Sequence, residues 1–225
     1  MDAFELAITP ELRPRVRVGW VSMHRLGEAR RGELDALVAA EIGRMRTADK
    51  GRTAGQIERL GPARSLYRAL GLDPTRHRPS PEALLRRVLR GDPFPRVHPA
   101  VDLANLWALE HGLPVGLYDA GRIEGRRITL RLGRPGEVYA GIRRPEIRLE
   151  GRPVLADAAG PFGNPTADSL RTAVGEHTED ALAVLFAPAD HPDDELARWL
   201  AWLEERARTL LSAGAVATGM SAAGS

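Results

Sequence analysis

The chain has 225 residues, of which 43% are apolar, and a formal net charge of +2. This length suffices for a sizeable core in one large domain, or in a domain with an appended helical element. The absence of cysteine excludes a disulfide framework, a thiolate zinc site, an iron–sulfur cluster and a cysteine nucleophile. No apolar run approaches the roughly 20 residues that span a bilayer, and the first residues lack the basic and apolar regions of a secretion signal. We therefore expect a cytoplasmic globular protein with no membrane partner.

The basic residues are nearly all arginine, with Lys50 as the sole lysine, and the sequence pI is about 9.5. We attribute the bulk of the arginine count to a GC-rich genome, because Ala, Gly and Pro are abundant as well. The distribution of charge is more informative. Residues 64–96 carry eight arginines and three acids, and residues 122–152 carry nine arginines and four acids, whereas residues 176–205 carry nine acids and one arginine. A basic middle and an acidic end predict one face suited to phosphate.

The first half of the chain favours helices. An alternating stretch beginning at Val16 predicts a strand, and apolar residues at helical spacing over 34–45 predict a helix after it. Further helices are predicted at 57–70, with an interruption near Gly61, then from Ser80 to Gly91 and from Pro99 to Gly112.

The second half changes to short strands separated by glycine-rich turns. These strands are predicted at 115–118, 127–132, 138–142, 147–149, 154–156, 171–174 and 181–187. A final helix is predicted at 193–211, and the Ala/Gly/Ser tail after Ser212 is predicted to be flexible. Helices clustered before a meandering run of strands predict an α+β fold, with helices packed on a mostly antiparallel sheet.

Several common site motifs are missing from the sequence. There is no GxGxxG at a strand-to-helix turn and no GxxxxGK[ST], so dinucleotide binding and ATP-dependent aminoacylation are unsupported. There is no GxSxG nucleophile elbow. The six histidines form neither HExxH nor a close HxH pair, so we expect no metal site and no cofactor.

Four blocks follow one another from Gly71 onward: GLDPTRHRPSPEALLRRVLRG, VDLANLWALEHGLPVGLYD, ITLRLGRPGEVYAGI and VLADAAGPFGNPTADSLRT. In this order they resemble the tRNA-editing B3/4 domain of the phenylalanyl-tRNA synthetase β subunit, as a free-standing protein. Each block mixes polar and glycine positions that packing alone does not dictate. The resemblance implies a B3/4-like core over 71–190. Around it, the sequence pattern predicts that 1–70 packs on the same domain, that 191–212 forms a C-terminal helix and that 213–225 is a flexible tail.

The resemblance also implies an activity. The synthetase domain binds the 3′ end of mischarged tRNA and hydrolyses the ester of a wrongly attached amino acid. Such a second sieve is useful because an apolar pocket rejects a close isostere by little more than about 100-fold. The ester is already reactive, so oriented water and stabilisation of the oxyanion suffice without a strong nucleophile.

Two departures from the synthetase pattern fall in the second block. The synthetase helix usually carries Thr-Asn, and its next strand carries a histidine after Pro-Met. This chain has Ala104 and Asn105 on the helix, and Gly116 where that histidine would be. Loss of the imidazole predicts a different and roomier pocket.

Three residues are candidates for a catalytic role. Asn105 lies on a helix face that is otherwise apolar, where a buried amide must find partners. Its amide either makes a structural hydrogen bond to the next strand or orients water or a ribose hydroxyl. Ser169 and Thr172 belong to the loop GPFGNPTADSLRT, which is either a rigid capped turn or one wall of a pocket.

Five further residues are candidates for binding the substrate. Asp102 either binds substrate or stabilises the start of its helix. Arg131 and Glu137 flank a turn and form either an exposed ion pair or a site for a phosphate or carboxylate and for an amine. Asp168 and Arg171 lie in the loop named above and offer polar groups to the same pocket wall.

A basic cluster beside the first block consists of Arg76, Arg78, Arg86, Arg87 and Arg90. These arginines form either a solvated helix face or contacts to tRNA phosphates, which would make binding strongly dependent on salt.

The sequence therefore predicts a protein that binds tRNA or aminoacyl-tRNA and hydrolyses a noncognate aminoacyl ester in trans. Two other readings stay open: a non-catalytic RNA-binding module, and a small-molecule binding protein with an amino-acid pocket. The identity of the amino acid, the tRNA and the oligomeric state are left open by the sequence.

Overall fold

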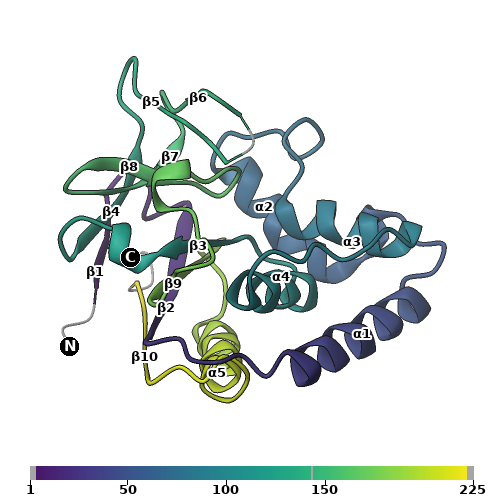
Figure 1. Ribbon diagram of the computed structural model, residues 1–225. Helices are drawn as coiled ribbons and strands as arrows, with labels where there is room; N and C mark the ends of the chain where they lie inside the picture. The colour runs from purple at the N-terminus through teal and green to yellow at the C-terminus, as the bar shows by residue number, and fades with distance from the viewer. Residues whose placement is uncertain (1–3, 143, 222–225) are drawn as a thin grey trace.

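The computed structural model describes residues 4–142 and 144–221 (Figure 1). The α-helices are α1 (Arg31–Ala48), α2 (Gly61–Ala69), α3 (Ser80–Arg90), α4 (Pro99–His111) and α5 (Asp193–Leu210), and the 3₁₀ helices are η1 (Ala54–Gln56), η2 (Glu58–Leu60), η3 (Ala120–Arg122) and η4 (Leu170–Thr172). The strands are β1 (Glu5–Ile8), β2 (Val16–His24), β3 (Val115–Asp119), β4 (Arg127–Leu132), β5 (Val138–Tyr139), β6 (Ile147–Arg148), β7 (Pro153–Asp157), β8 (Gly160–Gly163), β9 (Ala181–Pro188) and β10 (Ala215–Met220).

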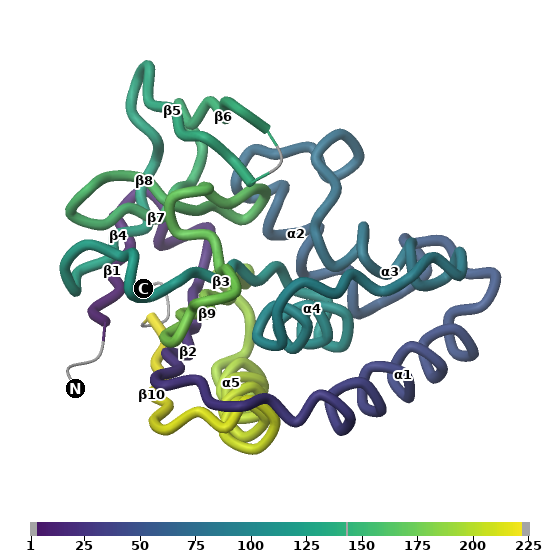
Figure 2. The backbone as a smooth tube through the Cα atoms, in the orientation of Figure 1, coloured from purple at the N-terminus to yellow at the C-terminus, as the bar shows by residue number. Residues whose placement is uncertain are grey.

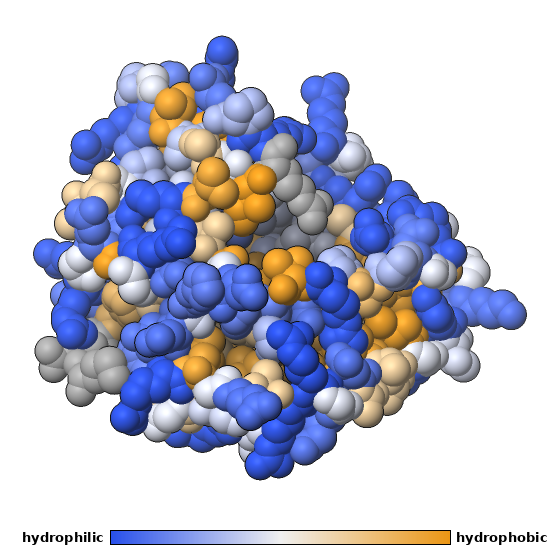
Figure 3. Space-filling model, viewed as in Figure 1, coloured by the Kyte–Doolittle hydropathy of each residue, from blue (hydrophilic) through white to orange (hydrophobic). Residues whose placement is uncertain are grey.

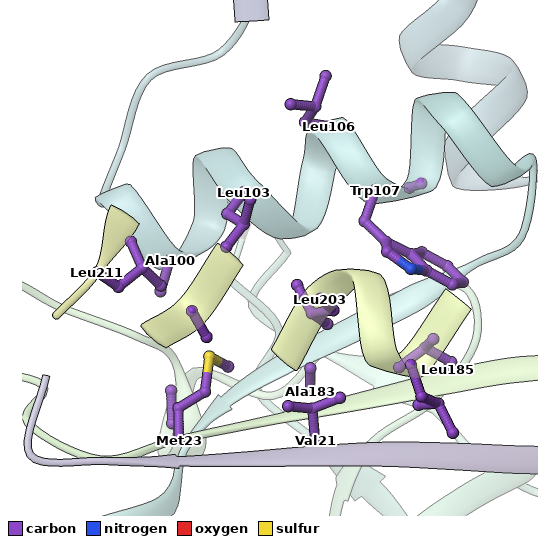
Figure 4. Packing of buried hydrophobic residues seen from close by; sticks show 14 of the residues in the cluster. Val21, Met23, Ala100, Leu103, Leu106, Trp107, Ala183, Leu185, Leu203 and Leu211 are labelled. Atoms are coloured by element: carbon purple, nitrogen blue, oxygen red, sulfur yellow. The ribbon is translucent and has the colours of Figure 1, made fainter. Parts of the chain in front are cut away.

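The central sheet has the order β10-β2-β9-β3, and every pair in it is antiparallel. Strand β9 is buried along its whole length. One face of the sheet packs on helices: Val21, Met23, Ala183 and Leu185 share a core with residues of α4 and α5, which Figure 4 shows around Trp107. Both ends of the chain contribute to this sheet, because β2 and β10 are neighbours in it.

The other face of the central sheet packs on a second sheet, with the order β1-β4-β7-β8. Alternate residues of β9, including Leu182, Val184 and Phe186, share a core there with Leu130 and Phe162. A small pair, β5 and β6, forms a third sheet, which lies apart from the helices α1 and α5 in Figure 2. Only β1 and β4 pair in parallel among the described strands. The predicted α+β class, with a mostly antiparallel arrangement, is confirmed.

Three sequence-based expectations are corrected. Residues 171–174 form no strand, because Ser169 caps the 3₁₀ helix η4 at this point. Residues 215–220 of the predicted flexible tail form β10, which pairs with β2 from Ala215 to Met220. The strands form separate sheets rather than one meander. The second sheet also contains β1 and β8, which the sequence does not predict. No described helix combines the length and apolar character needed to cross a membrane.

The end of α4 is held by a close backbone approach. Gly112 terminates the helix with φ of 70°, and its N–H donates to the carbonyl of Ala108. A Cβ at this position would lie 1.9 Å from the carbonyl oxygen of Arg59. Glycine is therefore needed twice here, once for the left-handed backbone and once for space.

We predict that Gly112→Ala lowers the free energy of unfolding by about 2 to 5 kcal/mol, because backbone strain and overpacking add. Gly91→Ala is the matched control, since Gly91 ends α3 with φ of 86° but has no atom within 4 Å of an added Cβ. It should cost about 1 to 2 kcal/mol. Urea denaturation of both variants measures this, and equal losses would contradict a role for the Arg59 contact.

Candidate functional site

All three tyrosines of the chain converge on one loop, residues 164–168, which follows β8. The hydroxyl of Tyr67 in α2 donates to the carbonyl of Pro165 (2.7 Å), and that of Tyr139 in β5 donates to the carbonyl of Ala167 (2.5 Å). The hydroxyl of Tyr118 in β3 donates to Oδ1 of Asp168 (2.7 Å). A loop anchored from three separate elements is pre-organised, as a binding site requires.

Asn164 fixes the conformation of this loop from within. Its side-chain Oδ1 accepts hydrogen bonds from the backbone N–H groups of Thr166 (2.7 Å) and Ala167 (2.8 Å). Its Nδ2 donates to the hydroxyl of Tyr139 (2.9 Å). The asparagine is 4% exposed, so these bonds satisfy an amide that would be costly to bury unpaired.

Asp168 is the titratable group at the centre of this arrangement. Burial raises the pKa of its carboxyl group to about 7, against the opposing effect of hydrogen bonds from the Tyr118 hydroxyl and the Asn164 backbone. Its charge in turn raises the pKa of Tyr67, Tyr118 and Tyr139, after the larger effect of their own burial. A carboxyl that titrates near neutral pH is uncommon away from functional sites.

The Gly116 position is filled rather than empty. A Cβ on Gly116 would lie 2.1 Å from the hydroxyl oxygen of Tyr118, and one on Gly163 would lie 2.3 Å from the same oxygen. The expectation of a roomier pocket at Gly116 is therefore corrected. The two glycines leave room for the Tyr118 hydroxyl to reach Asp168.

Asn105 lies on α4, half-buried, and its side chain makes no hydrogen bond to residues 4–142 or 144–221. Helix α4 packs against β3, the strand that carries Tyr118. Within the described chain, no hydrogen bond or ion pair joins Asn105 to Asp168. The Asn105 amide is thus free to bind water or a ligand.

Three candidates in the loop that ends in η4 are already engaged. The Oγ of Ser169 accepts from the N–H of Arg171 (3.1 Å), and Thr172 is fully buried, with its hydroxyl 3.4 Å from the carbonyl of Phe162. Arg171 itself forms a two-bond pair with Asp157 (2.9 and 3.0 Å). The geometry favours a structural role for Ser169, Thr172 and Arg171.

Three further candidates are paired in the same way. Asp102 is 3% exposed, with Oδ1 accepting from the N–H of Val97 and Oδ2 from Arg96, both at 3.2 Å. Arg131 and Glu137 form a two-bond pair at 2.8 and 2.7 Å. Hydrogen bonding to Arg131 lowers the pKa of Glu137. These charges are satisfied inside the protein, so they are poor anchors for a substrate.

The five arginines of the basic cluster separate into two groups. Arg90 pairs with Asp92 (2.6 and 3.1 Å), Arg87 donates to the carbonyl of Pro93 (3.2 Å), and Arg76 lies 3.8 Å from Asp73. Arg78 and Arg86 instead both face Glu82, at 3.6 and 3.8 Å. Arg64, which lies outside the predicted basic cluster, completes this second group at 2.9 Å from Glu82.

A cavity of about 820 Å³ lies elsewhere in the described structure. It is bounded by the loop after β2, the start of α4 and the loop before β9. Its charged and imidazole lining is Glu28, Arg31, His98, Glu176, His177 and Glu179. Burial and the nearby Arg31 lower the pKa of His98. Figure 3 shows that the molecular surface is also hollowed between the strands β5–β8 and the helices.

The sequence comparison decides the family. The B3/4 domain family matches residues 63–190, which is more than half of the chain. The chain belongs to the B3/4 domain family. The resemblance seen in its four sequence blocks is thereby confirmed, and the Tyr118–Asp168 pair lies inside the matched region.

This B3/4 domain is similar to parts of two larger proteins. It is 34% identical, over 117 residues, to the phenylalanine–tRNA ligase beta subunit of Nocardia farcinica (strain IFM 10152), which covers 51% of this chain and 14% of that one. The solved N-terminal fragment of the phenylalanyl-tRNA synthetase beta-subunit from Pyrococcus horikoshii aligns over 97% of this chain and 52% of the fragment, with 13% identity and a TM-score of 0.43. The chain thus spans a small part of the curated relative.

Sequence reasoning missed the groups that organise this B3/4 domain. Tyr118 sits in the second block, two residues after Gly116, but nothing in the sequence pairs it with Asp168, 50 residues later. Tyr67 lies before the first block, and the sequence distinguishes Asn164 only as one residue of its loop. The signal for them in the sequence is the presence of just three tyrosines in a chain poor in aromatic residues.

We predict that Tyr118→Phe raises the pKa of Asp168 by about one unit, because a lost hydrogen bond to the charged form costs about 1 to 1.5 kcal/mol. Tyr67→Phe is the control, since its hydroxyl bonds a backbone carbonyl instead. Carbon-13 NMR titration of the carboxyl resonance measures both. An equal shift in the two variants would mean that the Tyr118 bond does not set the Asp168 pKa.

Proposed function

We propose that this B3/4 domain binds aminoacyl-tRNA and hydrolyses the ester of a wrongly attached amino acid, leaving free tRNA and the amino acid. The family supports the tRNA side of this proposal, because the similar curated protein is a phenylalanine–tRNA ligase subunit. The observation that carries the hydrolytic side is the Asp168 carboxyl group, held by Tyr118 in an anchored loop.

Asp168 fits the α-ammonium group of the amino acid. Its Oδ1 accepts one bond from Tyr118, and a carboxylate has capacity for further donors. Ion pairing to an ammonium favours the charged carboxylate over the neutral acid, so the substrate itself would complete the site. Of the acidic candidates Asp102, Glu137 and Asp168, only Asp168 has no arginine partner in the described structure.

Asn105 supplies the second function in this proposal. Its amide has no hydrogen-bond partner in residues 4–142 and 144–221, and it can hold the attacking water or a ribose hydroxyl next to the ester carbonyl. The oxygen of water forms the new bond to the carbonyl carbon, and the ribose oxygen leaves with a proton. The inward placement of Ser169 and Thr172 fits a reaction that uses water rather than a protein nucleophile.

We expect Asp168→Asn to lower kcat/KM for aminoacyl-tRNA by at least about ten-fold, the size of one lost charge-assisted hydrogen bond. Asparagine still accepts from Tyr118, so the loop should keep its structure. The wild-type kcat/KM should fall as the pH drops through about 7, where Asp168 becomes protonated, and this fall should vanish in the variant.

Substrate chemistry provides the control for the role of Asp168. Acetylation of the amino group removes the ammonium charge, so the wild type and Asp168→Asn should hydrolyse N-acetylaminoacyl-tRNA equally slowly. If the variant lost activity equally on both substrates, Asp168 would act on the reacting atoms and not on the ammonium.

Asn105→Ala should lower the rate of ester hydrolysis by about 10- to 100-fold and leave affinity for tRNA within two-fold, because only the orientation of water is lost. Deacylation of tRNAs charged with each amino acid, with filter binding of uncharged tRNA, tests this. An unchanged hydrolysis rate would remove Asn105 from the mechanism. No hydrolysis across the panel, with tRNA still bound, would leave a non-catalytic RNA-binding module.

A second candidate function is binding of a free amino acid or similar small molecule. The cavity of about 820 Å³ favours it, since Arg31 and three glutamates in its lining complement the two charges of a zwitterion. Isothermal titration with the common amino acids would detect such binding, and its absence would leave the aminoacyl-tRNA proposal alone.

A further inference from the structure

The buried carboxylate of Glu82 is surrounded by more positive charge than it neutralises. Glu82 lies in the first turn of α3, and its side chain is 3% exposed. Arg64 of α2 donates to its Oε2 at 2.9 Å. The Nε atoms of Arg78 and Arg86 lie 3.6 and 3.8 Å from its Oε1. Three guanidinium cations thus share one carboxylate, which leaves a local charge of about +2.

The two outer guanidinium groups keep their hydrogen-bond donors available. Arg78 and Arg86 are too far from Glu82 for a hydrogen bond, and neither donates one to any other described residue. Their side chains are 43% and 49% exposed. Attraction to Glu82 holds both near one point without using their N–H groups. Two guanidinium forks held close together match the oxygens of a phosphate.

A cavity of about 230 Å³ adjoins this cluster, and Glu82 and Arg86 are part of its lining. Arg52 and Thr53 supply its other polar groups. The remainder is apolar, and comes from residues 54–60 and from α3: Ala54, Ile57, Leu60, Leu85 and Leu89. A largely apolar recess beside two arginines suits a ligand that is anionic at one end and largely apolar at the other.

We propose that Arg78 and Arg86 bind the phosphate of one unpaired nucleotide of an RNA strand, and that its base enters the adjoining cavity. This rests on the proposed function, which supplies the RNA partner. Unpaired nucleotides are bound by proteins through a basic track for the phosphates and a surface on which the bases lie. Arg64 is the positioning residue, because its hydrogen bond fixes the Glu82 carboxylate on which the other two arginines rest.

The test uses matched arginines of one helix. Arg86→Gln and Arg90→Gln change the net charge equally, and both residues lie on α3, but Arg90 is paired with Asp92. We expect Arg86→Gln and Arg78→Gln each to weaken binding of uncharged tRNA by at least about ten-fold and to reduce the salt slope by about one. Arg90→Gln should change affinity less than two-fold. Circular dichroism confirms that each variant is folded. Equal losses for Arg86→Gln and Arg90→Gln would overturn the proposal, because diffuse charge would then explain binding.

The cavity is tested by competition on the wild type. Adenosine monophosphate should displace tRNA at a concentration at least about ten-fold lower than inorganic phosphate does. Equal competition would overturn the placement of the base. If the wild type hydrolysed no aminoacyl-tRNA, but tRNA affinity fell only in Arg78→Gln and Arg86→Gln, the proposed hydrolysis would be wrong and the phosphate site would be supported. If the wild type hydrolysed aminoacyl-tRNA, but all three arginine variants lost tRNA affinity equally, the proposed hydrolysis would be supported and the phosphate site would be wrong.

Discussion

Complete burial of β9 is the constraint on which the arrangement of the other elements depends. A strand with apolar residues on both faces needs a packing layer on each side and a partner at each edge. Helices α4 and α5 cover one face, the sheet that contains β4 and β7 covers the other, and β2 and β3 pair with its edges. This position fixes β3, and through β3 it fixes Tyr118 in the layer between the two sheets.

The charged residues follow a second physical requirement. Inside the protein, a carboxylate must be paired or hydrogen-bonded, or its ionisation becomes unfavourable. Asp102, Glu137 and Asp157 satisfy this requirement by pairing with arginines. Several predicted site residues are therefore engaged in ion pairs inside the protein. Among the described residues, Asp168 satisfies it with a tyrosine hydroxyl and a backbone N–H, and burial raises its pKa against the effect of these two bonds. The exceptions to internal pairing are therefore where ligand binding is best sought.

The arginines, like the carboxylates, are informative where they lack a full complement of partners. Abundant arginine makes a basic surface unremarkable in this chain, and most guanidinium groups of the α3 region have a local acceptor or acid. Glu82 differs because one carboxylate serves three arginines. The functional information lies in the local ratio of charges around Glu82, where Arg64 of α2 meets the start of α3, and not in the arginine count.

The sequence by itself determined the α+β class, the family and the approximate bounds of α3, α4, β4 and β9, because local periodicity, glycine caps and polar blocks are written along the chain. It also marked Asn105 and Asp168 as candidates. Only the tertiary structure decided which candidates remain free, because pairing of Asp168 with Tyr118 or of Arg171 with Asp157 joins residues distant in sequence. The strand at 215–220 could not be predicted either, because its hydrogen-bond partners come from the distant strand β2 and its own Ala/Gly-rich composition does not indicate a strand.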